Sequence, residues 1–254
     1  MKEPVLALWK SHYSIGRSIL TLEKKGSSQA GGPESIIDIC IENGVKEFHL
    51  VDDSMGGFLE AYLNGNAAGL DLRFGLRIAI CNNCETKDED SLNRTSKYII
   101  FAKNKEGYKR LIKIYSFAAK EGFYYYPRIS FETLKTFWDE KDLILCVPFY
   151  DSFLHQNALY GKLCIPEFSF CNPRFLIEEN DIPFNDIILC HVKNYCKDKY
   201  KMIKAKSIYY KNKADFKSYL TFKCISNRTV LDKPEFENMT SDQFSFESWK
   251  EQTA

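Results

Sequence analysis

The sequence lacks an excess of charge of either sign. Its 254 residues carry 35 Lys and Arg against 34 Asp and Glu, which gives a formal net charge of +1. Proteins that bind nucleic acid mainly through charge need a large basic excess, so this balance excludes a histone-like or polybasic binder. Hydrophobic residues make up 44% of the chain, a share typical of a packed globular protein and too high for a disordered one.

Long hydrophobic runs are also missing. No apolar stretch approaches the roughly 20 residues that a membrane-spanning helix needs, so we expect no membrane partner. The first residues, MKEPVLALWKSHYS, contain few apolar residues before Lys10 and no small-residue cleavage site. We therefore expect no secretory signal and a cytoplasmic location.

Histidine is scarce, and the cysteines do not form a metal-binding pattern. The four histidines share no ligand spacing: His12, His49, His155 and His191. Of nine cysteines, only Cys81 and Cys84 form a close pair, without the second CxxC or His pair of a structural zinc site. We interpret Cys81 and Cys84 as incidental thiols at the end of a strand rather than as a zinc or redox site. Most of the other cysteines lie in apolar runs, which indicates reduced, buried thiols.

Short apolar runs alternate with helical patterns along the chain. The runs predict strands at residues 5–9, 47–51, 74–80, 98–102, 143–147, 175–177 and 202–208. Helices are predicted at 34–43, 105–120 and 181–196, and loops at 26–33 and 84–96. Strands of this length and composition are typical of a buried parallel sheet, so the pattern predicts an α/β barrel or a doubly wound sheet.

Charge is distributed unevenly. Residues 193–223 contain ten Lys against two Asp and are interleaved with tyrosines and phenylalanines. This composition is compatible with contacts to a nucleic-acid backbone and also with solvated helix and loop faces, and we prefer the second interpretation. The candidate nucleic-acid contacts are Lys199, Lys201, Lys204, Lys206, Lys211 and Lys213.

Residues 98–130 contain the most informative motif. A strand ends in AKN, a helix starts with EGYK, and EGFYYYPRIS follows. The segments before and after are KSHYS at 10–14, NGVKEFHLVDDSMGG at 43–57 and KAKSIYYKNKADFKSYLTFKCISN at 204–227. In this order they resemble the PHP (polymerase and histidinol phosphatase) domain at the N-terminus of bacterial-type, C-family replicative DNA polymerases. The resemblance covers nearly the whole chain.

The resemblance implies a distorted (β/α)7 TIM-like barrel over residues 1–228. It also implies that residues 229–254 are an acidic linker towards a polymerase palm domain that is absent from this chain. After Pro234 we expect an extended tail. Its aromatic residues should dock on the barrel or form the surface that meets the palm: Phe236, Phe244, Phe246 and Trp249.

The resemblance further implies a degenerate metal site. Active members of the family hold three metal ions through His and carboxylate side chains, and they hydrolyse phosphoesters or proofread a DNA 3′ end. The aligned positions here are Leu8, Lys10, His12, Asp52, Asp53, Arg77, Ser207 and Tyr209. Because Lys10 and Arg77 repel metal ions, we expect one of them to pair with Asp52 or Asp53. We expect no catalytic residue, no metal and no cofactor.

The leading hypothesis is a non-catalytic PHP-like domain of a C-family polymerase, excised or encoded separately in a split polymerase. It would act in DNA replication in a bacterial or phage-infected cell. Its partners would be the remaining polymerase domains, palm and fingers, on the same or a companion chain, with DNA or a proofreading subunit as further candidates. One alternative is a residual metal-dependent phosphoesterase or 3′–5′ exonuclease using Asp52, Asp53 and His12. Another is a single-stranded-DNA-binding module using the Lys- and Tyr-rich stretch.

Overall fold

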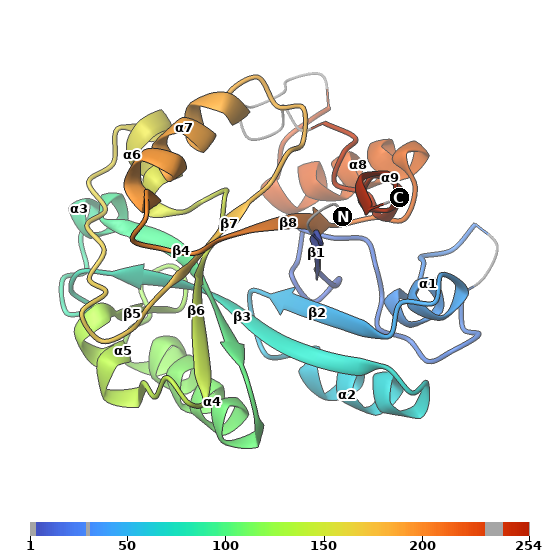
Figure 1. Ribbon diagram of the computed structural model, residues 1–254, viewed down its shortest axis with the longest axis horizontal. Helices are drawn as coiled ribbons and strands as arrows, with labels where there is room; N and C mark the ends of the chain where they lie inside the picture. Colours follow the sequence, from blue (N-terminus) through green and yellow to red (C-terminus); the bar gives the residue numbers. More distant parts are fainter. Residues whose placement is uncertain (1–3, 29–30, 232–240, 254) are drawn as a thin grey trace. The chain divides into compact units, whose positions relative to one another are not determined.

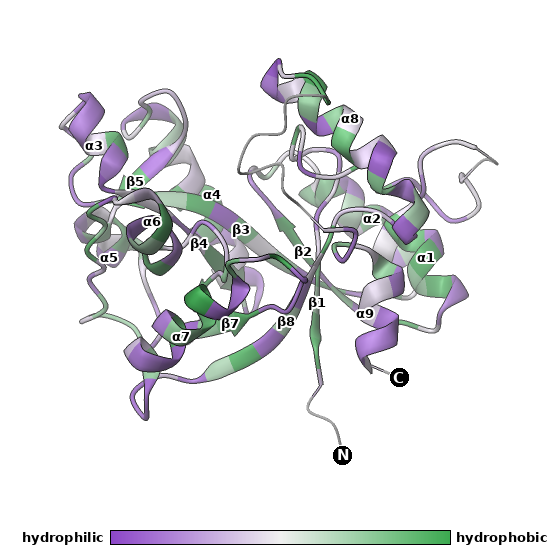
Figure 2. Cartoon of the chain, turned by 90° about the horizontal axis from the view of Figure 1, so that it is seen from above, coloured by the Kyte–Doolittle hydropathy of each residue, from purple (hydrophilic) through white to green (hydrophobic). Residues whose placement is uncertain are grey.

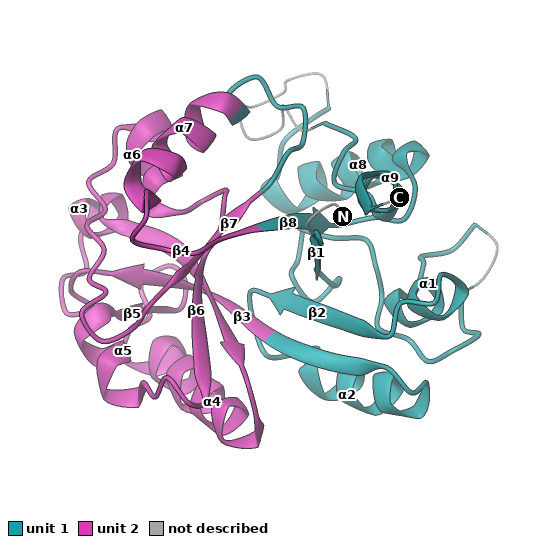
Figure 3. Cartoon of the chain, in the orientation of Figure 1, with its two compact units in different colours: residues 1–74, 178–185, 204–254 teal, residues 75–177, 186–203 magenta. Residues whose placement is uncertain are grey.

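The computed structural model describes residues 4–28, 31–231 and 241–253. The chain divides into two compact units, each built from separate segments (Figure 3). Unit 1 comprises residues 1–74, 178–185 and 204–254, and unit 2 comprises residues 75–177 and 186–203. The predicted boundary at residue 228 stays a prediction.

The strands follow one another in a closed order. They are β1 (Leu6–Trp9), β2 (Glu47–Asp52), β3 (Asp71–Cys81), β4 (Thr95–Ala102), β5 (Arg128–Ser130), β6 (Leu143–Val147), β7 (Arg174–Ile177) and β8 (Met202–Ile208) (Figure 1). Their order is β2-β1-β8-β7-β6-β4-β3-β5, and β3 also pairs with β2. Seven strands therefore form a closed ring with β5 outside it, and β3 and β8 each contribute residues to both units. The predicted α/β fold with a seven-stranded TIM-like barrel is confirmed.

The expected parallel pairing is wrong for β4. The β1–β2, β1–β8, β6–β7 and β3–β5 pairs are parallel, whereas β4 runs antiparallel to both β3 and β6. A buried strand has the same apolar composition in either direction, so local sequence does not determine how it pairs.

Unit 1 surrounds its strands with α1 (Ile36–Glu42), α2 (Phe58–Ala67), α8 (Phe216–Asn227) and α9 (Phe246–Thr253). The α1 helix begins where the Ser35 hydroxyl accepts a hydrogen bond from the Ile37 N–H, as an N-cap residue does. It ends at Glu42, and Gly44, just past the C-cap Asn43, has a φ of +67° that glycine readily adopts. Trp9, Phe48 and Phe58 are fully buried in this unit.

The described end of the chain is helical, so the expected extended tail is wrong for residues 246–253. The predicted docking is confirmed for three aromatic residues, while Phe236 and Pro234 lie outside the described residues. The Phe246 ring stacks on Trp9 at 5.3 Å and on Trp249 at 5.4 Å between ring centroids, and Phe244 is buried. Figure 2 shows β1 coloured as hydrophobic and the end of α9 as hydrophilic.

Unit 2 contains the segment with the strongest sequence motif. The α4 helix (Lys105–Lys120) has the predicted bounds, and the Asn104 side chain caps it by accepting from the Gly107 N–H at 2.9 Å. Just after α4, a Cβ placed on Gly122 would lie 1.9 Å from the carbonyl oxygen of Arg128. Glycine is therefore needed there because the backbone leading into β5 passes too close for any side chain.

Four further helices belong to unit 2: α3 (Glu89–Asn93), α5 (Phe131–Phe137), α6 (Phe153–Tyr160) and α7 (Asn185–Cys196), the last without its first residue. The expected loop at 84–96 is wrong because it contains α3 and the start of β4. Asp88 caps α3 by accepting a hydrogen bond from the Ser91 N–H at 2.8 Å. Phe168 makes edge-on ring contacts with Tyr98, Phe131 and Phe175 in the interior.

Candidate functional site

The predicted carboxylate Asp52 is the last residue of β2. Parallel pairing aligns Leu8 with His49 and Trp9 with Leu50, so β1 and β2 end at the same edge of unit 1. The residues that follow β1, beginning with Lys10, are therefore next to Asp52. In parallel α/β sheets this carboxyl edge is where functional side chains gather.

The Asp52 side chain is fully buried and is bonded to two serines. Its Oδ1 accepts from the Ser11 N–H at 2.9 Å and from the Ser14 hydroxyl at 2.8 Å, and its Oδ2 accepts from the Ser11 hydroxyl at 2.6 Å. Three of its roughly four acceptor positions are thus used by the chain itself. Burial raises the pKa of Asp52, while the Lys10 charge and the serine hydrogen bonds act in the opposite direction.

Lys10 pairs with the neighbouring carboxylate. Its Nζ lies 3.4 Å from Asp53 Oδ2, and the lysine side chain is buried. The expected ion pair between Lys10 and Asp53 is therefore present. A fixed positive charge at this edge raises the free energy of a divalent cation placed beside the same carboxylates.

Arg77 has a different partner. This residue of β3 forms an ion pair with Asp151, which follows β6, and both belong to unit 2. The sequence did not predict this ion pair, because Asp151 belongs to no recognised motif and lies 74 residues after Arg77. Asp151 has a φ of +61°, an uncommon conformation for a residue other than glycine.

The other aligned positions have structural contacts. Leu8 is buried in β1. The His12 ring packs against Tyr13 at 4.5 Å between centroids, and its Nδ1 has no hydrogen-bond partner among the described residues. The Tyr209 ring stacks on Phe244 at 5.2 Å.

Ser207 reveals a carboxylate that the sequence reasoning missed. Its N–H and hydroxyl donate to the two carboxylate oxygens of Glu178 at 2.9 and 2.8 Å, and Asn180 Nδ2 donates to the same carboxylate at 3.1 Å. Glu178 is buried and directly follows β7. An acid at the end of a strand marks the carboxyl edge of an α/β fold, and this signal could have found Glu178.

Metal-ligand geometry is not found in the described part of the chain. Within residues 4–28, 31–231 and 241–253, no three His, Cys, Asp or Glu residues are grouped so that they could hold a metal ion. Asp52 and Glu178 each accept hydrogen bonds from a serine instead of lying beside further ligands. The absence of a metal in the protein itself remains a prediction.

The lysine-rich stretch is less available than its composition suggests. Lys206 is fully buried and donates to the Glu179 carbonyl at 2.9 Å, so its inclusion among the nucleic-acid contacts is wrong. Lys211 pairs with Glu34 and Glu42, and Lys213 pairs with Glu251. The remaining three are exposed: Lys199, Lys201 and Lys204.

Most aromatic side chains of this stretch contact other rings of the protein. Tyr195 and Tyr200 stack with centroids 6.0 Å apart, and Tyr210 packs against Tyr219 at 5.1 Å. Tyr210 and Tyr219 are buried. The Tyr210 and Tyr219 rings therefore stabilise the interior rather than offering faces on which bases could stack.

Comparison with known families agrees with the fold and with the sequence motifs. The family described as PHP domain matches residues 27–164. Since this is more than half of the chain, the protein belongs to the PHP domain family.

Curated relatives are DNA polymerase III alpha subunits. The chain is 34% identical over 95 residues to the DNA polymerase III subunit alpha of Helicobacter pylori strain 26695. It is 34% identical over 83 residues to the subunit of the same name from Borreliella burgdorferi. These regions cover 37% and 32% of this chain but only 8% and 7% of the relatives, so the similarity involves a small part of much larger proteins.

No helix among the described residues is both long and apolar enough to cross a membrane.

Proposed function

We propose that this protein is a non-catalytic PHP-like domain that acts in DNA replication as a scaffold for the palm and fingers domains of a C-family polymerase. These domains belong to the same or a companion chain, in the cytoplasm of a bacterium or of a phage-infected cell. The family membership and the alpha-subunit relatives support the link to replication. The bonding of Asp52 to Ser11 and Ser14 supports the absence of catalysis.

Few side chains remain that could act as metal ligands for hydrolysis. A multi-metal site needs several convergent carboxylates and imidazoles held close to ideal distances. The Asp52 carboxylate accepts hydrogen bonds from Ser11 and Ser14, and the Asp53 carboxylate forms an ion pair with Lys10. Lys10 has no acceptor atom while it is charged, so it cannot replace a ligand.

The decisive experiment measures metal content after dialysis and 3′–5′ exonuclease activity in Mg²⁺, Mn²⁺ and Zn²⁺. We expect no stoichiometric metal and no metal-dependent hydrolysis, in the wild type and in Asp52→Asn alike. The matched control is Asp71→Asn, which removes an exposed carboxylate that pairs with Arg73. Activity that disappears in Asp52→Asn and persists in Asp71→Asn would establish the phosphoesterase alternative.

The scaffold role has its own test. Cross-linking in cells of the source organism, followed by purification of this chain and mass spectrometry, should identify a C-family polymerase as a partner. Cross-links confined to proteins unrelated to replication contradict the scaffold role, even if the domain proves inactive.

A second candidate function is supported by two exposed lysines of unit 2, Lys199 and Lys201. If they contact a single-stranded DNA backbone, affinity should fall steeply between about 50 and 200 mM salt. Anisotropy of a labelled oligonucleotide measures this dependence. The double variant Lys199→Ala/Lys201→Ala should then bind more weakly than the control Lys211→Ala/Lys213→Ala, whose lysines form ion pairs with Glu34, Glu42 and Glu251. Equal binding by the two variants excludes the DNA-binding module.

A further inference from the structure

The pair Cys81 and Cys84 has a geometry that its sequence motif alone did not reveal. Cys81 ends β3, and its sulfur lies 3.4 Å from the sulfur of Cys84. Both thiols are reduced in the structure and are largely buried, with 1% of Cys81 and 8% of Cys84 exposed. Two sulfurs this close need to move only a little to form a disulfide bond of about 2.05 Å.

A buried positive charge lies beside this dithiol. The Arg128 side chain is fully buried, and its Nη2 donates to the carbonyls of Cys84 at 3.4 Å and Thr86 at 2.6 Å. Its Nη1 donates to the Ser91 hydroxyl at 2.9 Å, and its Nε to the Gly122 carbonyl at 3.2 Å. No carboxylate pairs with Arg128 among the residues that the structure describes. A buried cation without an anion is costly, so the surroundings of Arg128 favour a nearby negative charge.

Cys84 is a thiol on which the Arg128 charge acts, and its sulfur lies 3.9 Å from the Arg128 carbonyl oxygen. The hydrogen bond from Cys81 and the charge of Arg128 lower the pKa of the Cys84 thiol to about 7, although burial acts in the opposite direction. For Cys81, the same hydrogen bond and burial raise the pKa. The pair therefore places a thiol with a lowered pKa beside a thiol with a raised pKa, the division of roles found in redox-active dithiols.

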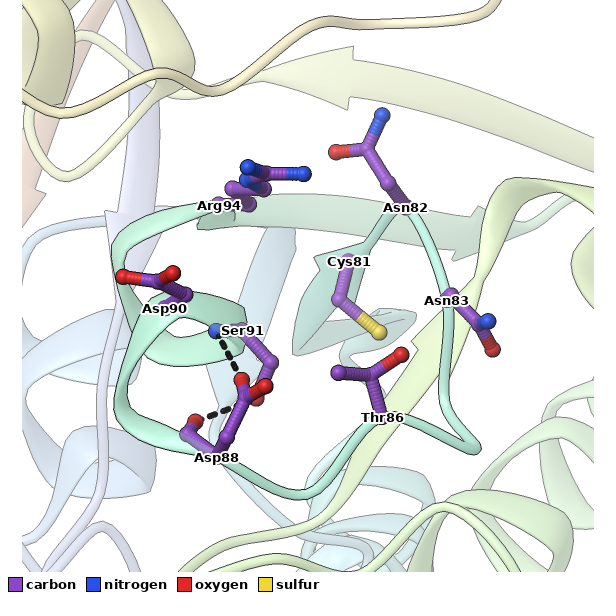
Figure 4. A pocket seen from close by; sticks show the side chains of 8 residues that line it. All are labelled: Cys81, Asn82, Asn83, Thr86, Asp88, Asp90, Ser91 and Arg94. Carbon is purple, nitrogen blue, oxygen red and sulfur yellow. Dashed lines mark hydrogen bonds between the residues drawn. The ribbon is translucent and has the colours of Figure 1, made fainter.

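A small pocket reaches Cys81, whose sulfur lies 3.4 Å from that of Cys84, and Cys84 itself is not among the lining residues. It has a volume of about 150 Å³ and is lined by Cys81, Asn82, Asn83, Thr86, Asp88, Asp90, Ser91 and Arg94. Figure 4 shows the Cys81 sulfur pointing inward among these side chains. A water molecule occupies about 30 Å³ of liquid, so a molecule slightly larger than water fits this space.

We propose that Cys81 and Cys84 form a redox-active dithiol that is oxidised to an intramolecular disulfide by a small hydroperoxide. The Cys84 thiolate attacks one oxygen of hydrogen peroxide, the O–O bond breaks, and Cys84 becomes a sulfenic acid while hydroxide leaves and is protonated to water. Cys81 then attacks the Cys84 sulfur, the S–O bond breaks, and the departing hydroxide takes the Cys81 proton. The two thiols lose two electrons and two protons, and peroxide becomes two waters.

The reactivity concerns unit 2 alone and is independent of the proposed scaffold role. A metal site is the less suitable interpretation of the same pair. Two thiols are too few for the four-coordinate sites that zinc prefers, and no third ligand completes a group in the described residues.

The test treats the reduced full-length chain with hydrogen peroxide at pH 7, blocks the remaining thiols by alkylation, and maps peptides by mass spectrometry. We expect a Cys81–Cys84 disulfide to form about tenfold faster than Cys190 is oxidised, because Cys190 is an exposed thiol outside the dithiol. Oxidation of Cys190 at the same rate or earlier overturns the proposal. The wild-type measurement requires no variant and therefore does not depend on how a substitution folds.

Three variants separate the roles of the two sulfurs. In Cys81→Ser, which keeps a hydroxyl donor, the Cys84 sulfenic acid should persist and be labelled by dimedone. In Cys81→Ala, which removes the donor, Cys84 should react several-fold more slowly. The matched control Cys190→Ser should form the Cys81–Cys84 disulfide at the wild-type rate. Equal Cys84 reactivity in Cys81→Ser and Cys81→Ala, or no dimedone label on Cys84 in either, contradicts the assigned roles.

Discussion

Ser11 donates to the Asp52 carboxylate twice, through its backbone N–H to Oδ1 at 2.9 Å and through its hydroxyl to Oδ2 at 2.6 Å. These hydrogen bonds join the segment that follows β1 to Asp52, the last residue of β2, at the carboxyl edge of unit 1. Ser14 extends the connection, because its hydroxyl donates to Asp52 and accepts from the Asp53 N–H at 2.9 Å. A carboxylate at the usual position for catalysis thus holds a turn of the backbone in place.

Removing this carboxylate should destabilise the protein. Asp52→Ala leaves the Ser11 and Ser14 donors buried without their acceptor, and we expect a loss of about 3 kcal/mol in the free energy of unfolding. Asp52→Asn keeps an acceptor oxygen and should lose about 1 kcal/mol. Urea denaturation measures both values. The exposed control Asp71→Asn should change stability by less than about 0.5 kcal/mol, and an equally small effect of Asp52→Ala would show that these bonds contribute little.

The buried Lys206 should make stability depend on alkaline pH. Burial lowers the pKa of Lys206 to about 8, whereas an unfolded lysine titrates near 10.4. Between these values the unfolded chain binds more protons, so wild-type stability should rise with pH relative to a variant without this amine. Lys206→Met should be more stable than wild type by roughly 2 kcal/mol at pH 7, where the buried amine is charged.

This advantage of Lys206→Met should shrink as the pH rises from about 8 to about 10. Urea denaturation of both proteins across that range provides the measurement. A stability difference that is constant with pH contradicts the lowered pKa. The comparison is Lys211→Met, which removes the ion pairs of Lys211 with Glu34 and Glu42.

The docking of α9 rests on Phe246. Its ring lies between Trp9 and Trp249, and its side chain is buried, so Phe246→Ala should cost about 3 kcal/mol of unfolding free energy. Trp249→Phe should cost about 1 kcal/mol, because Trp249 Nε1 donates to the Val5 carbonyl at 2.9 Å. Thermal and urea denaturation give both numbers. The control is Ile225→Ala, whose side chain is 70% exposed, and a similar loss there would mean that the Phe246 effect is not specific to this contact.

Gly122 should tolerate no side chain. The Cβ of alanine would lie 1.9 Å from the Arg128 carbonyl oxygen, which belongs to the backbone and cannot rotate away. We expect Gly122→Ala to lose about 3 kcal/mol or more. Gly69→Ala is the matched comparison, because Gly69 has a φ of +72° but no atom within 4 Å of the added Cβ, and should cost about 1 kcal/mol. Equal losses measured by urea denaturation would mean that the backbone near Arg128 shifts easily.

Several elements were predictable because their signals are local. The strands Leu143–Val147 and Met202–Ile208 and the helix Lys105–Lys120 have the bounds predicted from apolar runs, helical periodicity and capping residues. The seven-stranded barrel followed from the resemblance of ordered motifs to the PHP family. The strand β5 was missed because Ile129 is the one apolar residue among its three, so it forms no apolar run.

The candidate site was only partly predictable. Asp52 and Asp53 were predicted because they align with a metal-ligand motif of the PHP family, and the opposite charge of Lys10 favoured the observed pair. Glu178 directly follows β7 but lies in none of the aligned motifs, so it was not predicted. The Arg77–Asp151 pair joins residues 74 positions apart, and no local pattern reports such a contact.

The sequence by itself determined which residues form most strands and helices, and it indicated the family. These properties depend on residue type and on short-range periodicity, which a linear chain displays directly. The tertiary structure alone decided that β4 runs antiparallel, that Ser11 and Ser14 satisfy Asp52, and that Arg128 is buried beside Cys84. Each of these depends on which distant segments meet in space, and burial and hydrogen bonding acquire their energies only once those segments have come together.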